Sequence, residues 1–288
     1  MGRRRRGRRS RALGRSTPAG LVARYTTLLF ATLITIGPLL WELSTSLKSK
    51  SEDVYAATPQ FVPHHPTFDN YGEVARTIPV WHFAANSLVV AILCVAGNLV
   101  GATFAGFALA RLRFRGRGLV FGLFLSALLL PAEVTIISQF QTITRLGLGD
   151  SLLGVALPGM IGALNVLLMR NAFLSIPQDI DEAAVIDGAT VLQRIRFVGL
   201  PNVKGTLAVI AILTFIGAWD DFLWPLLVLQ TPSNLTLTVG LSYLKSTFSA
   251  DPRTIAAGAM IALVPILVLF VCLQRLFFKG VGEGAVKG

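Results

Sequence analysis

Charged residues are scarce in this chain, at 14% of 288 residues, whereas a soluble domain carries about 25%. Cysteine is scarcer still. The only two, Cys94 and Cys272, both lie inside apolar runs, so the sequence excludes a disulfide scaffold and a thiol metal site. Hydrophobic residues make up 53% and the mean hydropathy is +0.65, which also excludes a disordered chain. Too few polar groups remain to cover a water-facing surface, so the sequence predicts several membrane spans.

Signatures of catalysis are missing as well. The sequence contains no G-x-x-x-x-G-K-[ST] phosphate loop, and its last glycines lie in a polar tail instead of between a strand and a helix. The histidines His64, His65 and His82 have no cysteine or carboxylate at ligand spacing, so they are more typical of loop residues than of a metal site. We therefore expect no catalytic residue, no metal and no cofactor on this chain.

Six apolar runs are long enough to cross about 30 Å of hydrocarbon, which takes about 20 helical residues. They cover 21–47, 84–110, 119–140, 152–169, 206–229 and 255–277. The runs are apolar on every face, as helices among lipid and other helices are, and they lack the alternation of a membrane barrel. The predicted fold class is an all-α polytopic membrane protein, with six transmembrane helices in one transmembrane domain, 21–277.

Lysine and arginine flank these runs unevenly. With the N-terminus in the cytoplasm, 20 of the 26 fall on cytoplasmic segments, so the positive-inside rule places both termini inside. Residues 1–20 then form a basic cytoplasmic tail attracted to anionic headgroups, and 278–288 form a second cytoplasmic tail. A cleaved signal peptide would have a shorter apolar run, and a nucleic-acid-binding arm is the weaker explanation of the arginines, so no nucleic-acid partner is expected.

The longest predicted cytoplasmic loop, 171–205, contains the sharpest local pattern. Pro177 suits the first turn of a helix, and acidic residues follow it where the helix dipole favours negative charge. These acidic residues are Asp179, Asp181 and Glu182. Residues able to end or cap helices come next, in the order Gly188, Thr190 and Pro201. The loop is therefore predicted to be a helix, a turn and a second helix held against the membrane.

The same loop resembles a known motif. It reads E-A-A, three residues, G, nine residues, V, one residue and L-P, which resembles the EAA loop of membrane subunits of bacterial ABC importers, with Val198 where isoleucine is commoner. The resemblance implies a short coupling helix seated in a groove of an ATPase subunit, with Glu182 as the charge contact. The residues implied in ATPase coupling are Glu182, Ala183, Ala184, Asp187, Gly188, Leu200 and Pro201.

Four other stretches resemble the carbohydrate-importing group of these permeases, and together they extend the resemblance from about residue 24 to 288. They are N-S-L at 86–88, F-A-L-A-R-L-R-F at 107–114, W-D-D-F-L-W-P-L at 219–226 and G-A-V-K-G at 284–288. The ending resembles that of the smaller maltose-type permease. Asp220 departs from the family pattern, which has asparagine there, and a carboxylate in a span is costly unless it is solvated or paired.

The resemblance implies a protein of the bacterial cell membrane with several partners. These are a dimer of cytoplasmic ATP-binding subunits, a second permease subunit and an extracellular or periplasmic solute-binding protein. Each permease would form half of a pathway for a sugar or oligosaccharide. Aromatic faces can stack on sugar rings while amides satisfy hydroxyls, so the candidate pathway residues are Asn86, Trp219, Asp220 and Trp224.

Two alternatives remain open. The solute could be another small polar molecule, such as a polyol or a glycerol phosphate. The chain could instead be a stand-alone channel or ion-coupled carrier, which is expected to have inverted halves with ion ligands in matching places. Glu133, Asp220 and Asp221 are the carboxylates well inside the later runs, and they do not recur symmetrically. The sequence therefore favours the importer permease.

Overall fold

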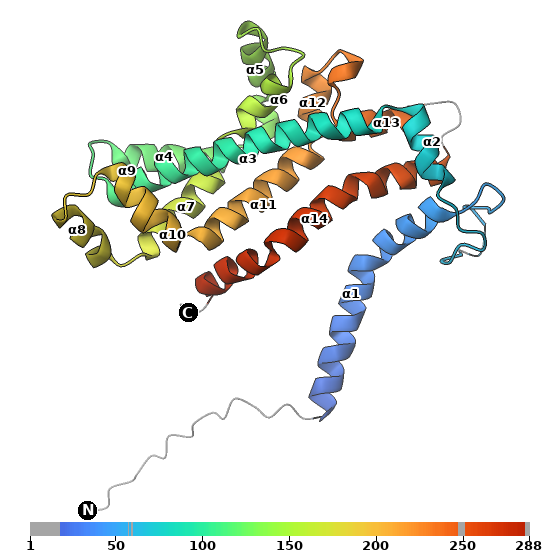
Figure 1. The fold of residues 1–288 in the computed structure, drawn as a ribbon, viewed down its shortest axis with the longest axis horizontal. Helices are drawn as coiled ribbons and strands as arrows, with labels where there is room; N and C mark the ends of the chain where they lie inside the picture. Colours follow the sequence, from blue (N-terminus) through green and yellow to red (C-terminus); the bar gives the residue numbers. More distant parts are fainter. Residues whose placement is uncertain (1–17, 57, 59, 247–250, 286–288) are drawn as a thin grey trace, which may run out of the picture.

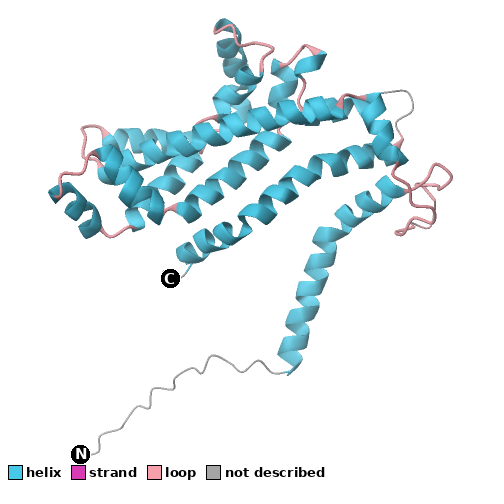
Figure 2. Cartoon of the chain, viewed as in Figure 1, coloured by secondary structure: helices cyan, strands magenta, loops and turns pink. Residues whose placement is uncertain are grey.

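The computed structural model describes residues 18–56, 58, 60–246 and 251–285. These residues form helices joined by turns and loops, and no strand occurs among them (Figure 2). The predicted basic tail as far as residue 17 and the last three residues of the G-A-V-K-G ending lie outside the described residues.

The helices follow one another along the chain as drawn in Figure 1. In order they are α1 (Pro18–Leu47), α2 (Asp69–Thr77), α3 (Val80–Arg111), α4 (Arg117–Ala127), α5 (Ala132–Arg145), α6 (Leu152–Ala156), the 3-10 turn η1 (Leu157–Gly159), α7 (Ala163–Ser175), α8 (Gln178–Ile186), α9 (Val191–Gln193), the π-helical turn η2 (Arg194–Gly199), α10 (Leu200–Asn202), α11 (Lys204–Asp220), α12 (Leu223–Val228), the 3-10 turn η3 (Pro232–Asn234), α13 (Leu237–Ser246) and α14 (Pro252–Ala285).

Three of the described helices, α1, α3 and α14, are long and apolar enough to cross a membrane. Two bent pairs can each count as a further span, which brings the number among the described residues up to five. In one pair α6 and η1 meet α7 at 45°, and in the other the segment Val191–Asn202 meets α11 at 83°. The predicted all-α membrane class is thus confirmed, while the count of six spans stays a prediction.

The third and fifth apolar runs are each interrupted. α4 ends at Ala127 and α5 begins at Ala132, directly after Pro131. Proline has no backbone N–H to continue a helix and disfavours the helical conformation in the residue before it, which explains this break. In the fifth run α11 ends at Asp220, Asp221 is extended, and α12 follows. Polar side chains therefore occur beside free helix ends within predicted spans.

Helix α3 is the centre of the packing and lies against α7 and α11 (Figure 1). Small residues permit the close approach. A Cβ on Gly97 would lie 2.6 Å from the Cβ of Met160, and one on Gly106 would lie 2.9 Å from the backbone nitrogen of Arg170. Glycine is needed at both positions because the neighbouring backbone occupies the space that a side chain would fill.

A buried asparagine joins α3 to the bent fourth run. The side chain of Asn98 is 1% exposed. Its Nδ2 donates to the carbonyl oxygens of Cys94 (3.0 Å) and Gly159 (2.6 Å), and its Oδ1 accepts from the Gly162 amide (2.8 Å). Oδ1 also accepts from Asn165 Nδ2 (2.8 Å), which donates in turn to the Thr214 hydroxyl on α11 (3.0 Å). These bonds satisfy the backbone groups that the bend at η1 frees.

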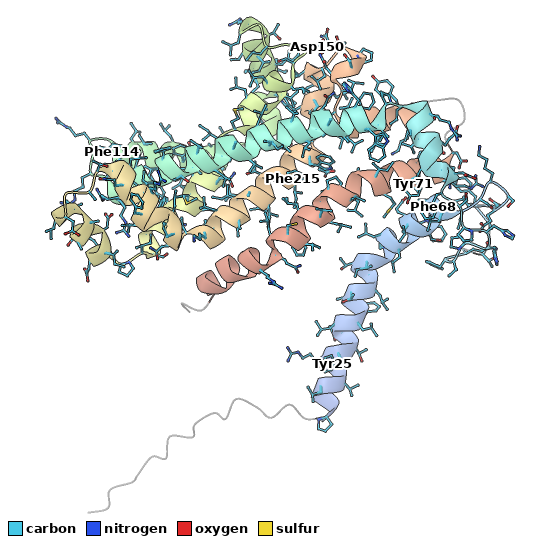
Figure 3. All side chains as sticks on the ribbon, viewed as in Figure 1. Tyr25, Phe68, Tyr71, Phe114, Asp150 and Phe215 are labelled. Carbon is cyan, nitrogen blue, oxygen red and sulfur yellow. The ribbon has the colours of Figure 1, made fainter. Side chains whose placement is uncertain are left out.

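Large apolar side chains remain exposed over α1 and much of α14. No part of the most apolar stretch of α1 is buried within the chain, and Figure 3 shows Tyr25 pointing away from the other helices. Exposed apolar surface on this scale is covered by lipid or by another subunit.

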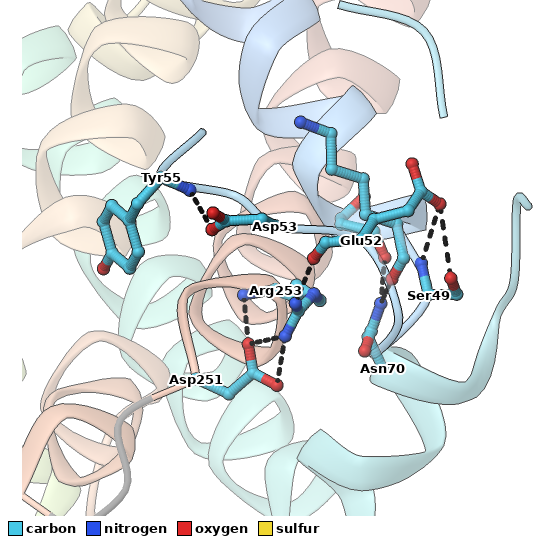
Figure 4. A network of polar contacts seen from close by, with 9 residues as sticks. Ser49, Glu52, Asp53, Tyr55, Asn70, Asp251 and Arg253 are labelled. Carbon is cyan, nitrogen blue, oxygen red and sulfur yellow. Dashed lines mark hydrogen bonds and ion pairs between the residues drawn. The ribbon is translucent and has the colours of Figure 1, made fainter. Parts of the chain in front are cut away.

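A polar network closes the end of the molecule where α1 finishes (Figure 4). The Glu52 carboxylate accepts hydrogen bonds from the backbone amides of His64 (3.0 Å), His65 (3.2 Å) and Ser49 (3.2 Å). Arg253, at the start of α14, pairs with Asp251 (3.0 Å) and donates to the Glu52 carbonyl oxygen. Desolvation raises the pKa of Glu52, but the amide hydrogen bonds outweigh it and lower the pKa from 4.5 to about 2.

Candidate functional site

The loop after α7 folds as its sequence predicts. Helix α8 starts directly after Pro177, carries Asp179 and Asp181 in its first turn, and ends before Gly188. Gly188 has a φ of +78°, the left-handed conformation that glycine adopts without strain. Thr190 then caps α9, since its hydroxyl oxygen accepts from the Gln193 amide (3.3 Å). Figure 1 shows α8 at the extreme end of the molecule, opposite α2 and α13.

A buried ion pair joins the two arms of this loop. Arg194 Nε donates to Asp181 Oδ1 (3.0 Å), its NH2 group donates to the second carboxylate oxygen, and both side chains are 11% exposed. The guanidinium also lies 5.4 Å from the ring centre of Phe107 on α3. Sequence reasoning assigned Asp181 only to the helix dipole, and the partner 13 residues away has no motif to reveal it. The pair fixes α8 to η2 and to the end of α3.

One side of α8 is exposed. Glu182, Ala183, Val185 and Ile186 are exposed, with Ile186 at 85%, and we call these four residues the outward face of α8. Gln178 Nε2 donates to the Glu182 carboxylate (2.6 Å). The other predicted coupling residues lie beside this face or behind it: Asp187, Gly188 and Pro201 are exposed, whereas Ala184 and Leu200 are half-buried. The outward face of α8 therefore presents one carboxylate, that of Glu182, among exposed apolar side chains.

The base of α8 is held by arginines of α3 and η2. Arg111 donates to the carbonyl oxygens of Phe173 (2.7 Å) and Ile176, the last carbonyls of α7. Next to it is a cavity of about 870 Å³, whose lining includes Arg111, Arg117, Arg194 and Asp181. Three residues of the outward face, Glu182, Val185 and Ile186, line the same cavity. These side chains thus connect α8 with the ends of α3 and α7.

A second site, which we call the polar cavity, lies where α3, α5, η1, α11 and α12 meet. Its volume is about 470 Å³. Its polar lining comes from five residues spread over 89 positions of the chain. These are Glu133, Gln139, Asn165, Thr214 and Asp221, joined by Trp224 and by apolar residues such as Val90 and Ile136. The breaks in the third and fifth apolar runs open this cavity, since each places a helix end beside it.

Asp150 lies in the loop between α5 and α6, and Figure 3 shows it near α12. It has a φ of +52°. Its carboxylate accepts from the backbone amides of Gln230 (2.8 Å) and Thr231 (3.0 Å), and its carbonyl oxygen accepts from Asn234 Nδ2 (2.8 Å). Hydrogen bonds from the hydroxyl and amide of Thr231 hold the pKa of Asp150 well below its usual range. The strained turn is thus tied to the loop after α12.

The four predicted pathway residues do not lie together. Trp224 lines the polar cavity, while its indole N–H donates to the Val155 carbonyl oxygen (3.1 Å). Asn86 is buried and donates to the carbonyl oxygens of Ser233 and Leu235, both at 2.9 Å. Trp219 is buried and stacks on Phe215. Asp220 is exposed and lines a different cavity of about 520 Å³, together with Lys245 and Trp219.

Sequence reasoning missed most of the polar cavity. Gln139, Asn165 and Thr214 belong to no motif, although each is a polar residue in or next to an apolar run, which is the one signal that could have found them. Glu133 and Asp221 were noticed as carboxylates in the spans without being assigned to a common site.

A helical membrane protein with a protruding helix–turn–helix loop at one end and a polar cavity among its broken helices is a transport subunit of the permease class. Residues 81–283 match the family described as "Binding-protein-dependent transport system inner membrane component", and the chain belongs to that family.

Its relatives are similar over nearly their whole length. The galactooligosaccharides transport system permease protein GanQ of Bacillus subtilis (strain 168) is 33% identical over 274 residues, which cover 93% of this chain and 96% of that protein. The arabinooligosaccharides transport system permease protein AraQ of Halalkalibacterium halodurans is 32% identical over 261 residues, covering 90% and 94%. A chain in the crystal structure of a bacterial ABC transporter involved in the import of the acidic polysaccharide alginate has a TM-score of 0.79 and 25% identity, covering 92% of this chain and 98% of that chain.

Proposed function

We propose that this chain is one permease subunit of an ATP-driven importer and forms half of the pathway for a sugar or oligosaccharide. The similarity to two oligosaccharide permeases over about nine-tenths of the chain carries the choice of solute. The partners proposed are a dimer of cytoplasmic ATP-binding subunits, a second permease and an external solute-binding protein. ATP is hydrolysed on the ATP-binding subunits and not on this chain.

The outward face of α8 is proposed as the contact with the ATP-binding subunit. Glu182 offers a charge for a basic side chain of that subunit, and Ala183, Val185 and Ile186 offer apolar surface that water otherwise covers. The Asp181–Arg194 pair makes α8 and η2 move together, and α10 leads directly into α11. Motion of the ATPase would reach the polar cavity through α11, which contributes Thr214, Gly217 and Ala218 to its lining.

The polar cavity is proposed as this chain's share of the pathway. Sugars carry many hydroxyl groups, so a site for them needs hydrogen-bonding side chains together with an aromatic or apolar wall. Glu133, Gln139 and Asp221 supply the first, and Trp224 with Ile136 supplies the second. Of the residues proposed from the sequence, Trp224 lines the polar cavity, and Asp220 and Trp219 line the cavity of about 520 Å³. Asn86 instead supports the surrounding helices through its hydrogen bonds to Ser233 and Leu235.

We propose that the chain crosses the membrane six times, with both termini, α8 and residues 171–205 in the cytoplasm of a bacterial cell. The permease domain is 21–277, flanked by tails 1–20 and 278–288. This orientation places the Glu52 network and Asp150 outside. A reporter fused after residue 50 is expected outside and one fused after residue 196 inside, and the reverse result would overturn the topology.

Reconstitution tests the function directly. The importer, assembled with its ATP-binding subunits, partner permease and binding protein in liposomes, should accumulate a labelled oligosaccharide only when ATP is present on the ATPase side. Uptake that needs an ion gradient and no ATP would favour the carrier and overturn the proposal. Uptake of a polyol or glycerol phosphate in place of any saccharide would keep the importer and change its solute.

A further inference from the structure

Two carboxyl groups are among the residues that line the polar cavity. Glu133 comes from α5 and Asp221 from the break between α11 and α12, and no lysine or arginine is among the residues that line the cavity in the described part of the chain. Glu133 lies in the first turn of α5, where the helix dipole stabilises a carboxylate. The Asp221 carboxylate accepts from the Trp224 amide (3.4 Å). The start of α5 and the Trp224 amide could each attract a solute anion, but the carboxyl groups of Glu133 and Asp221 already lie there.

The N–H donors of the lining are also largely engaged within the protein. Asn165 Nδ2 donates to Asn98 and to Thr214, and the Trp224 indole donates to Val155. Gln139 Nε2 donates to the Thr135 hydroxyl (2.8 Å). A solute in the cavity therefore meets acceptors, above all two carboxylates. Hydroxyl and ammonium groups can donate to them, whereas a carboxylate or phosphate group cannot.

We propose that the polar cavity admits saccharides that are uncharged or carry amino groups and rejects acidic ones, an inference that rests on the proposed function. The solved relative belongs to a transporter of an acidic polysaccharide, yet its fold is similar. The fold thus leaves the charge of the solute open, and the charges in the cavity decide it through their potential.

A single cysteine can report that potential. Gly217 lies on α11, lines the cavity, and has nothing within 4 Å of the position of a Cβ, so Gly217→Cys fits without strain. In the assembled importer carrying Cys94→Ala and Cys272→Ala, we would measure the rates at which a trimethylammonium and a sulfonate methanethiosulfonate modify this cysteine. The ratio of the two rates, divided by the ratio for free 2-mercaptoethanol, should exceed about 10.

Neutralising the carboxylates identifies the cause. Glu133→Gln together with Asp221→Asn should return the ratio to that of the free thiol. Glu73→Gln, which removes a half-buried carboxylate on α2 outside the cavity, should leave it high. A ratio near that of the free thiol in the parent protein would overturn the inference. So would a high ratio that persists after both neutralisations.

Saccharides give the second measurement. A neutral or amino-bearing trisaccharide delivered by the binding protein should slow modification of Gly217→Cys, and a uronate trisaccharide should not. Equal protection by the acidic trisaccharide would overturn this inference while leaving the proposed function intact. If the reconstituted importer accumulates no saccharide at all, the proposed function fails, and the assignment of a saccharide class fails with it.

Discussion

The α8 loop and the polar cavity are built in opposite ways. In the loop, helix start, left-handed glycine and cap follow one another within 14 residues, from Pro177 to Thr190, and each acts on its immediate neighbours. In the cavity, the polar side chains come from separate helices, and two of the helix breaks are needed to bring them together. The shape of the α8 loop is thus determined by a short segment, whereas the polar cavity depends on how distant helices pack.

The largest effect is expected from the loop. Glu182→Lys should lower ATP-driven uptake by at least about tenfold while the protein still assembles, because placing like charges together at an interface costs several kcal/mol. Measurements of uptake and of ATP hydrolysis in liposomes test this prediction.

Asp179→Lys is the matched control, since Asp179 is exposed on the same helix but lies outside the motif that resembles the EAA loop. It should retain most of the uptake. Normal uptake by Glu182→Lys would remove the assignment of α8 as the coupling contact.

The Asp181–Arg194 pair tests whether the α8 loop also depends on a contact between residues that are 13 positions apart. Asp181→Ala should destabilise the loop by about 3 kcal/mol, because it leaves a buried guanidinium without its partner. A lowered melting temperature of the purified importer would record this. Replacing Arg194 as well should recover part of the loss, and strictly additive losses would show that the two residues do not interact.

A substitution at Asn98 tests how far the polar cavity depends on the packing of distant helices. Asn98→Ala removes partners from the Gly159 carbonyl, the Gly162 amide and Asn165 at one stroke, with an expected cost of about 2 kcal/mol. The exposed Asn202, which bonds only within its own turn, provides the matched control, and Asn202→Ala should cost much less. Equal melting temperatures for the two variants would mean that the polar cavity does not need its buried amides.

The Glu52 network, remote from both sites, adds a pH test. The pKa of Glu52 is lowered to about 2 in the folded protein, so its contribution to stability is present above pH 4.5 and is lost as the pH falls toward 2. The melting temperature should fall over that interval by more in the parent protein than in Glu52→Gln. Identical pH profiles would contradict the prediction.

The smallest effect is expected at Asp220. This residue is exposed, and the structure records no ion pair for it among the described residues. Asp220→Asn should leave assembly and melting temperature unchanged and alter solute preference if its cavity belongs to the pathway. Comparing uptake of several saccharides with thermal stability separates the possibilities. A loss of stability would instead reveal a structural partner, and wild-type behaviour in both assays would dismiss any special role.

The sequence predicted features that depend on neighbouring residues. The limits of α8, the left-handed Gly188 and the Thr190 cap could be predicted because each is a local preference of the backbone. The apolar runs located the helices, but hydropathy averages over a span and so does not register a break at Pro131 or Asp221. Asn165 and Thr214 look like isolated polar residues until α7 and α11 bring them within 3.0 Å.

Because the segment Val191–Asn202 meets α11 at 83°, it is oriented to act on α11 as a lever arm. A push along the first segment is nearly perpendicular to α11, so it turns that helix instead of sliding it. If the Asn165–Thr214 hydrogen bond acts as the pivot, it lies about 15 Å from the start of α11 and about 9 Å from its far end at 1.5 Å per residue. With α11 as a rigid rod, a 3 Å push at Lys204 swings Asp220 by about 2 Å in the opposite direction. The far end of α11 would therefore open outward when its foot is drawn inward.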